Sequence, residues 1–155
     1  LPNETELDKI LIETLAAGKD TTKKSFILFG SVLAVTTPTA VVICGYCKSS
    51  GKHTAQAGAA MFFGNNSALN NFVRVWGQQN NARADLVALL LAVQRAPKTK
   101  SLIISTRSEY AIRSITDYAY KNDACGWTCV NGDILKSITG WIQCRTAPIH
   151  FNHIK

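Results

Sequence analysis

The sequence is poor in acidic residues. Its 155 residues include 10 Asp and Glu against 17 Lys and Arg, which gives a formal net charge of +7 and a pI near 9.3. Such a surplus of cations favours an anionic partner, either nucleic acid or an acidic protein. The cations form no block, so the surplus is equally typical of an ordinary basic surface.

The sequence also lacks a recognisable signal peptide and a disulfide-like rhythm of cysteines. Its five cysteines are an odd number at irregular spacing. Both features are typical of a reducing compartment, and we therefore expect free thiols and an intracellular protein of the nucleus or cytoplasm. The length suits one compact domain with a short appendage.

Charge is absent between Lys24 and Lys48, over a stretch long enough in principle to cross a bilayer. Pro38 interrupts this stretch, and the β-branched residues on both sides of it favour buried strands over one continuous helix. We therefore expect no membrane segment. Upstream, residues 5–17 have the apolar spacing of a short amphipathic helix that either covers the domain, binds a partner or ends a preceding domain. Residues 1–38 are predicted to be an N-terminal extension.

Repeats, low-complexity segments, nucleophile-and-base pairs and phosphate-binding glycine loops are missing from the sequence. The rest of the sequence consists of segments whose apolar residues have the spacing of strands and segments whose apolar residues have the spacing of helices. We predict strands at 40–46, 55–63, 70–76, 101–106 and 149–154, and helices at 81–96, 109–121 and 132–144. Three hairpin-linked strands followed by alternating helices and strands indicate an α/β domain over 39–155, with a mixed sheet flanked by helices.

Residues 71–90 combine a strand, a polar turn and a helix start. One acid, Asp85, is expected in the first turn of that helix. There the free amides and the helix dipole favour a negative charge, so Asp85 has an ordinary structural interpretation beside a functional one.

Several short motifs occur in the order typical of one known family. They are Cys44-Gly45, Ala57-Gly58, the run Gly77 to Leu86, Ser105-Thr106-Arg107-Ser108, Gly126-Trp127 and the run Asn131 to Leu135. Together they resemble the ribonuclease H family over residues 40–155. The resemblance implies a mixed five-stranded sheet whose first three strands are antiparallel, with the C-terminal part of the family's domain truncated or lost.

Active members of that family cleave the RNA strand of RNA/DNA hybrids with two Mg²⁺ ions held by carboxylates. At three of these positions the chain has Cys44 for Asp, Asp85 for Glu and Arg107 for Asp, and the fourth carboxylate would lie beyond Lys155. A thiol and a guanidinium are unsuited to Mg²⁺, so we expect no metal cofactor and no activity, with Asp85 as the remaining acid. Arg107 is expected either to pair with Asp85 or to turn outward from the strand end.

The resemblance also suggests retained binding of a nucleic acid duplex, in particular an RNA/DNA hybrid. Asn81 occupies the family's minor-groove position, although it is also a candidate cap of its helix. The expected set of contacts is Asn81, Arg83, Arg74, Lys48, Lys52, Tyr118 and Lys121. Phosphate contacts require only charge and placement, so they can persist without catalysis.

Three alternatives stay open from the sequence. The first is a dimerising or scaffold domain of a retroelement-derived protein, related to reverse transcriptases, with partner contacts through residues 5–35. The second is an active RNA–DNA hybrid ribonuclease. The third is a zinc site formed by Cys44, Cys47, Cys125 and Cys129.

Overall fold

The computed structural model describes residues 37–155. The predicted helix at 5–17, the expected partner surface of residues 5–35 and nearly all of the 1–38 extension lie outside the described residues. Within the described part of the chain, no helix is long and apolar enough to cross a membrane.

The elements follow the predicted order. They are β1 (Thr39–Lys48), β2 (Gln56–Phe62), β3 (Asn71–Arg74), α2 (Asn81–Arg95), β4 (Leu102–Thr106), α3 (Glu109–Thr116), α4 (Ala119–Ala124), α5 (Gly132–Gln143) and β5 (Ile149–His153). The single helix expected at 109–121 is wrong, because the chain forms two short helices there. The first ends at the β-branched pair Ile115 and Thr116, which disfavours helix continuation.

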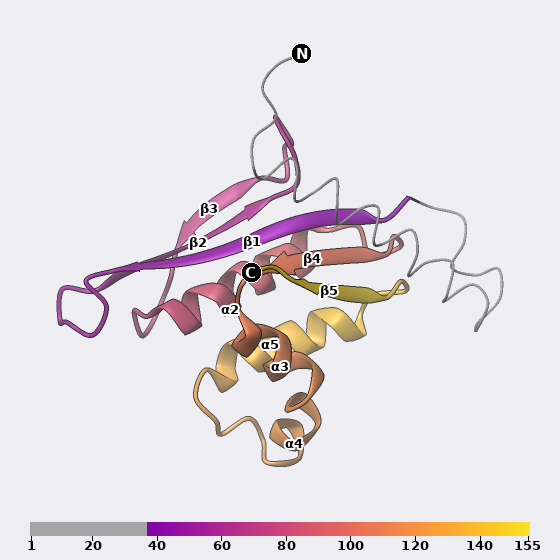
Figure 1. Cartoon of the computed structure of the whole chain (residues 1–155). Helices are drawn as coiled ribbons and strands as arrows, with labels where there is room; N and C mark the ends of the chain where they lie inside the picture. Colours follow the sequence, from indigo (N-terminus) through magenta and orange to yellow (C-terminus); the bar gives the residue numbers. More distant parts are fainter. Residues whose placement is uncertain (1–36) are drawn as a thin grey trace.

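The strands form one mixed sheet in the order β3-β2-β1-β4-β5 (Figure 1). β1 pairs antiparallel with β2, and β2 pairs antiparallel with β3. The pairs β1–β4 and β4–β5 are parallel. This confirms the expected five-stranded sheet with three antiparallel strands first.

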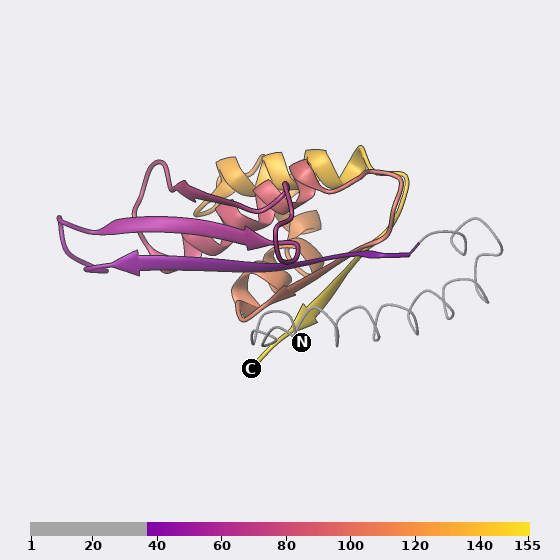
Figure 2. The same cartoon turned by 90° about the horizontal axis from the view of Figure 1, so that it is seen from above.

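The two faces of the sheet differ in what covers them. Val41, Ile43 and Cys47 of β1 are buried on the face that packs against α2, which we call the inner face. Figure 2 shows α2 and α5 together on this side of the sheet. Because side chains alternate along a strand, Cys44 and Tyr46 lie on the opposite, outer face.

Gly45 brings β1 and α2 into unusually close contact. A Cβ atom placed on Gly45 would lie 2.4 Å from the Asp85 backbone nitrogen and 2.7 Å from the Ala84 carbonyl carbon. Backbone atoms in the middle of a packed helix cannot move aside easily, so the position requires glycine.

We predict that Gly45→Ala lowers the free energy of unfolding by about 1–3 kcal/mol or more, because the added methyl forces α2 away from β1. Urea denaturation measures the change. Gly140→Ala is the matched control, since Gly140 lies in α5 with nothing within 4 Å of its added Cβ. The control is expected to raise stability by about 0.5–1 kcal/mol through helix propensity. Equal stability of Gly45→Ala and the natural protein would contradict the close contact.

Candidate functional site

The start of α2 is capped by Asn80, and this placement corrects two expectations. The Asn80 side chain accepts a hydrogen bond from the Arg83 backbone N–H at 2.8 Å. Asn81 is therefore the first helical residue and not the cap, and Asp85 follows the first turn, which contains no acid. The Asp85 carboxylate instead accepts a hydrogen bond from the Gly45 backbone N–H at 2.9 Å.

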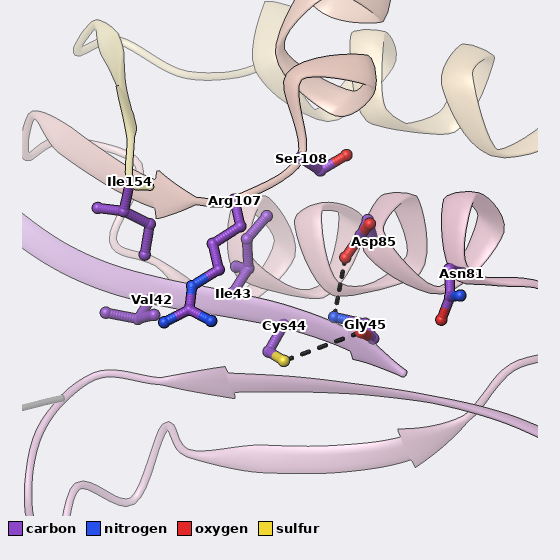
Figure 3. Close-up of a pocket in the computed structure, with 9 residues that line it drawn as sticks. All are labelled: Val42, Ile43, Cys44, Gly45, Asn81, Asp85, Arg107, Ser108 and Ile154. Atoms are coloured by element: carbon purple, nitrogen blue, oxygen red, sulfur yellow. Dashed lines mark hydrogen bonds between the residues drawn. The ribbon is translucent and has the colours of Figure 1, made fainter. Parts of the chain in front are cut away.

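An open pocket of about 480 Å³ lies at the end of β4, where β1 continues past it (Figure 3). Its lining is Val42, Ile43, Cys44, Gly45, Asn81, Asp85, Arg107, Ser108 and Ile154. The structure thus brings together Cys44, Asp85 and Arg107, the three residues predicted from the sequence to share one site. Asn81 is exposed at the same pocket.

Of the two expectations for Arg107, the ion pair with Asp85 does not form, and the outward orientation is the one that the structure has. The ion pairs of residues 37–155 join Arg83 to Asp133 and Arg113 to Glu109. Figure 3 shows the exposed Arg107 side chain directed toward Val42, away from Asp85. Arg107 follows the end of β4 at Thr106, whereas Asp85 lies on α2, so the two side chains come from different elements that border the same pocket.

Asp85 is half-buried, and its surroundings oppose its charge. Burial raises the pKa of Asp85 above its ordinary value, and hydrogen bonds from the Gly45 N–H and the Ser108 side chain offset part of this rise. The sequence named Ser108 only as part of the Ser105-Thr106-Arg107-Ser108 motif and not as a site residue. Ser108 caps α3 by accepting from the Ala111 N–H at 3.1 Å, and its position three residues before the first buried residue of α3 was the available signal.

The donor atoms of the pocket do not fit two magnesium ions. Mg²⁺ requires hard oxygen ligands, whereas the pocket offers one carboxylate, one thiol and one guanidinium. Over residues 37–155, no group of three or more His, Cys, Asp or Glu side chains is placed to hold a metal ion. The alternative zinc site does not form there either, because Cys44 is exposed on the outer face while Cys47 is buried on the inner face.

The structure contradicts the expectation that Arg83 contacts phosphate. Its side chain is buried, with the residue only 6% exposed, and its guanidinium binds Asp133 at 2.8 and 3.1 Å. Its Nε donates to the Trp76 carbonyl at 2.7 Å. Arg83 therefore joins the loop before α2 to the start of α5 and is not available to a ligand. This hydrogen bonding lowers the pKa of Asp133.

The other residues expected to bind nucleic acid lie in separate places. Lys48 and Arg74 line a second, smaller groove on the outer face. Lys52 is exposed in the turn between β1 and β2, and Tyr118 and Lys121 are exposed at α4. Of the expected contacts, the structure brings only Asn81 to the pocket at Asp85.

The sheet order, the helices on its inner face and the pocket at the end of β4 define the class of ribonuclease H-like α/β domains. The family model described as RNase H matches residues 40–155, and the chain belongs to this family. Ribonuclease H1 of Mus musculus is 31% identical over 90 residues, which cover 57% of this chain and 32% of the relative. The chain thus spans about a third of that relative's length.

Solved structures agree with this fold. The protease-reverse transcriptase of prototype foamy virus superposes with a TM-score of 0.61 at 18% identity, covering 78% of this chain and 18% of that chain. A foamy viral protease-reverse transcriptase in complex with dsDNA gives a TM-score of 0.58 at 15% identity, covering 75% of this chain and 80% of that chain. At these identities the similarity shows the fold alone.

The pKa shifts of Asp85 and Asp133 predict opposite pH dependences of folding stability. The raised pKa of Asp85 means that the folded state binds more protons than the unfolded state from about pH 4 up to the raised value, so the Asp85 contribution to stability falls as pH rises through this window. The lowered pKa of Asp133 gives a contribution that is present above about pH 4 and is lost as pH falls through the lowered value.

We therefore expect Asp85→Asn to gain stability relative to the natural protein as pH rises from acidic to neutral, and Asp133→Asn to lose it. Urea unfolding at several pH values measures both differences. Parallel pH trends in the two variants would contradict the assigned environments.

Proposed function

We propose that this domain binds a nucleic acid duplex, in particular an RNA/DNA hybrid, and does not cleave it by the metal-dependent route of the family. The observation that carries the proposal is Arg107 at the pocket beside Asp85, where the family resemblance calls for a second carboxylate. A fixed positive charge in that position repels divalent cations and attracts phosphate.

Arg107 suits phosphate for a second reason. The guanidinium presents a planar set of donors that matches the oxygens of one phosphate, and here it is exposed and free of the Asp85 carboxylate. Asn81 lies at the same pocket with its amide exposed and provides a polar contact to a groove edge. Lys52, Tyr118 and Lys121 remain proposed outer contacts of the same duplex.

The names of the relatives support the ligand class. The matched relative is a ribonuclease H1, and one foamy viral neighbour is a complex with dsDNA. For this chain the duplex is our proposal. The alternatives are an active hybrid ribonuclease and a scaffold or dimerising domain, and the two experiments below separate them.

The first experiment tests the metal site. We expect no manganese binding by the natural protein, because one carboxylate beside a guanidinium cannot hold the ion. The double variant Cys44→Asp/Arg107→Asp places three carboxylates around the pocket and should gain Mn²⁺ affinity, measured by electron paramagnetic resonance. Asp133→Asn in the same double variant is the control, since Asp133 pairs with Arg83 away from the pocket. Manganese binding by the natural protein would contradict the expected loss of the metal site, and Mn²⁺-dependent hybrid cleavage would establish the active alternative.

The second experiment tests duplex binding through its salt dependence. Arg107→Ala should weaken binding of an RNA/DNA hybrid and reduce the slope of log K against log salt by about 1, because one phosphate contact is lost. Arg95→Ala is the control, since exposed Arg95 lies at the other end of α2, about 21 Å along the helix from Asn81. Absence of hybrid binding at low salt would reject the proposal and leave the scaffold role.

A further inference from the structure

The outer face of the sheet has a groove that is separate from the pocket at Asp85. Its volume is about 290 Å³. Its lining is Tyr46, Lys48, Gln56, Ala57, Gly58, Phe72 and Arg74, from the three antiparallel strands β1, β2 and β3. We call it the outer groove, and none of its residues lines the pocket at Asp85.

Gly58 forms the floor of the outer groove. It pairs with Tyr46 on β1 and with Arg74 on β3, so all three positions lie in one row across the sheet. Gly58 has no side chain, and the tip of the Phe72 ring occupies the space beside it, since a Cβ on Gly58 would lie 2.6 Å from the Phe72 Cζ. The Phe72 ring therefore lies over the floor of the groove, which Tyr46 and Arg74 also line.

Two aromatic rings on this face are exposed to an unusual degree. Tyr46 is 66% exposed on the central strand β1, and Phe72 is 70% exposed on the edge strand β3. The contact with Gly58 buries one edge of the Phe72 ring, and the rest of the ring is exposed to solvent. Nothing in the packing of residues 37–155 accounts for the exposure of Tyr46. Large exposed apolar groups that lie together mark a binding surface.

The charge around these rings has one sign. From residue 21 to residue 84, the sequence contains no Asp or Glu. The first three strands and their turns therefore carry cations without acids, and Lys48 and Arg74 border the rings directly. This combination is complementary to an anion that also presents flat, apolar faces.

We propose that the outer groove binds single-stranded nucleic acid, with bases stacked on Tyr46 and Phe72 and phosphates at Lys48 and Arg74. β1 and β3 lie about 10 Å apart across β2, so one strand can place a base on each ring. Stacking on exposed aromatic side chains beside a cationic track is how proteins bind single strands without sequence preference. The proposal does not depend on duplex binding at Arg107, because the two sites share no residue.

The test uses the full chain and three fluorescein-labelled probes at low salt: oligothymidylate and oligouridylate of about 12 nucleotides, and an RNA/DNA hybrid. Fluorescence anisotropy measures affinity. Tyr46→Ala and Phe72→Ala should each weaken single-strand binding about tenfold and leave hybrid binding unchanged. Phe72→Trp should retain affinity, because it keeps a stacking surface. Tyr120→Ala is the matched control, since Tyr120 is 90% exposed on α4, outside the groove.

Arg107→Ala separates this proposal from the proposed function. It should weaken hybrid binding and leave single-strand binding unchanged, so loss of hybrid binding alone counts only against the duplex site. A preference for oligothymidylate or for oligouridylate that Tyr46→Ala and Phe72→Ala weaken supports the groove in either case and shows which kind of strand it binds more tightly. No binding of either single strand, or single-strand affinity unaffected by Tyr46→Ala and Phe72→Ala with unchanged circular dichroism, would overturn the proposal.

Discussion

The contact between Gly45 and the backbone of α2 is the constraint on which the site depends. β1 extends past the end of its pairing with β4, which stops at Val42 and Ser105, so the Gly45 N–H needs another acceptor. Asp85 supplies it at 2.9 Å, and only a glycine allows the helix to come this close. Asp85 therefore has a structural role, as acceptor for an exposed strand, that does not require a metal ion or a reaction.

The charges around this contact are the basis for proposing a phosphate ligand at the pocket in place of a metal ion. Burial disfavours the ionised form of Asp85. The other two positions at which the family has carboxylates are occupied by the Cys44 thiol and the Arg107 guanidinium. Arg107 does not neutralise Asp85, because its side chain is directed toward Val42 and away from Asp85 (Figure 3). Its positive charge thus stays exposed at the pocket mouth. Removing one carboxylate weakens a metal site, whereas replacing it by arginine reverses the sign of the field that a ligand meets.

The sequence predicted the elements and the sheet well, because alternation, helical spacing and the ordered motifs are local signals. It also predicted that Cys44, Asp85 and Arg107 lie at one site. It failed where a residue's role depends on a distant partner: Arg83 is typical of an exposed phosphate contact until Asp133, 50 residues later, is placed against it. The cap was missed for a different reason. Asn80 and Asn81 are chemically identical neighbours, and only the backbone angles decide which one caps α2.

The two faces of β1 have different surroundings. Its inner residues Val41, Ile43 and Gly45 are held by α2, so their tolerance to change is limited by packing. Its outer residues Cys44 and Tyr46 contact solvent and border the two candidate ligand surfaces. Substitutions at Cys44 and Tyr46 are therefore expected to alter the proposed binding with little cost in stability, whereas substitutions at the inner positions are expected to lower stability. The outer residue Val42 is an exception, because it is buried in a second apolar cluster with Phe62 and Ile154.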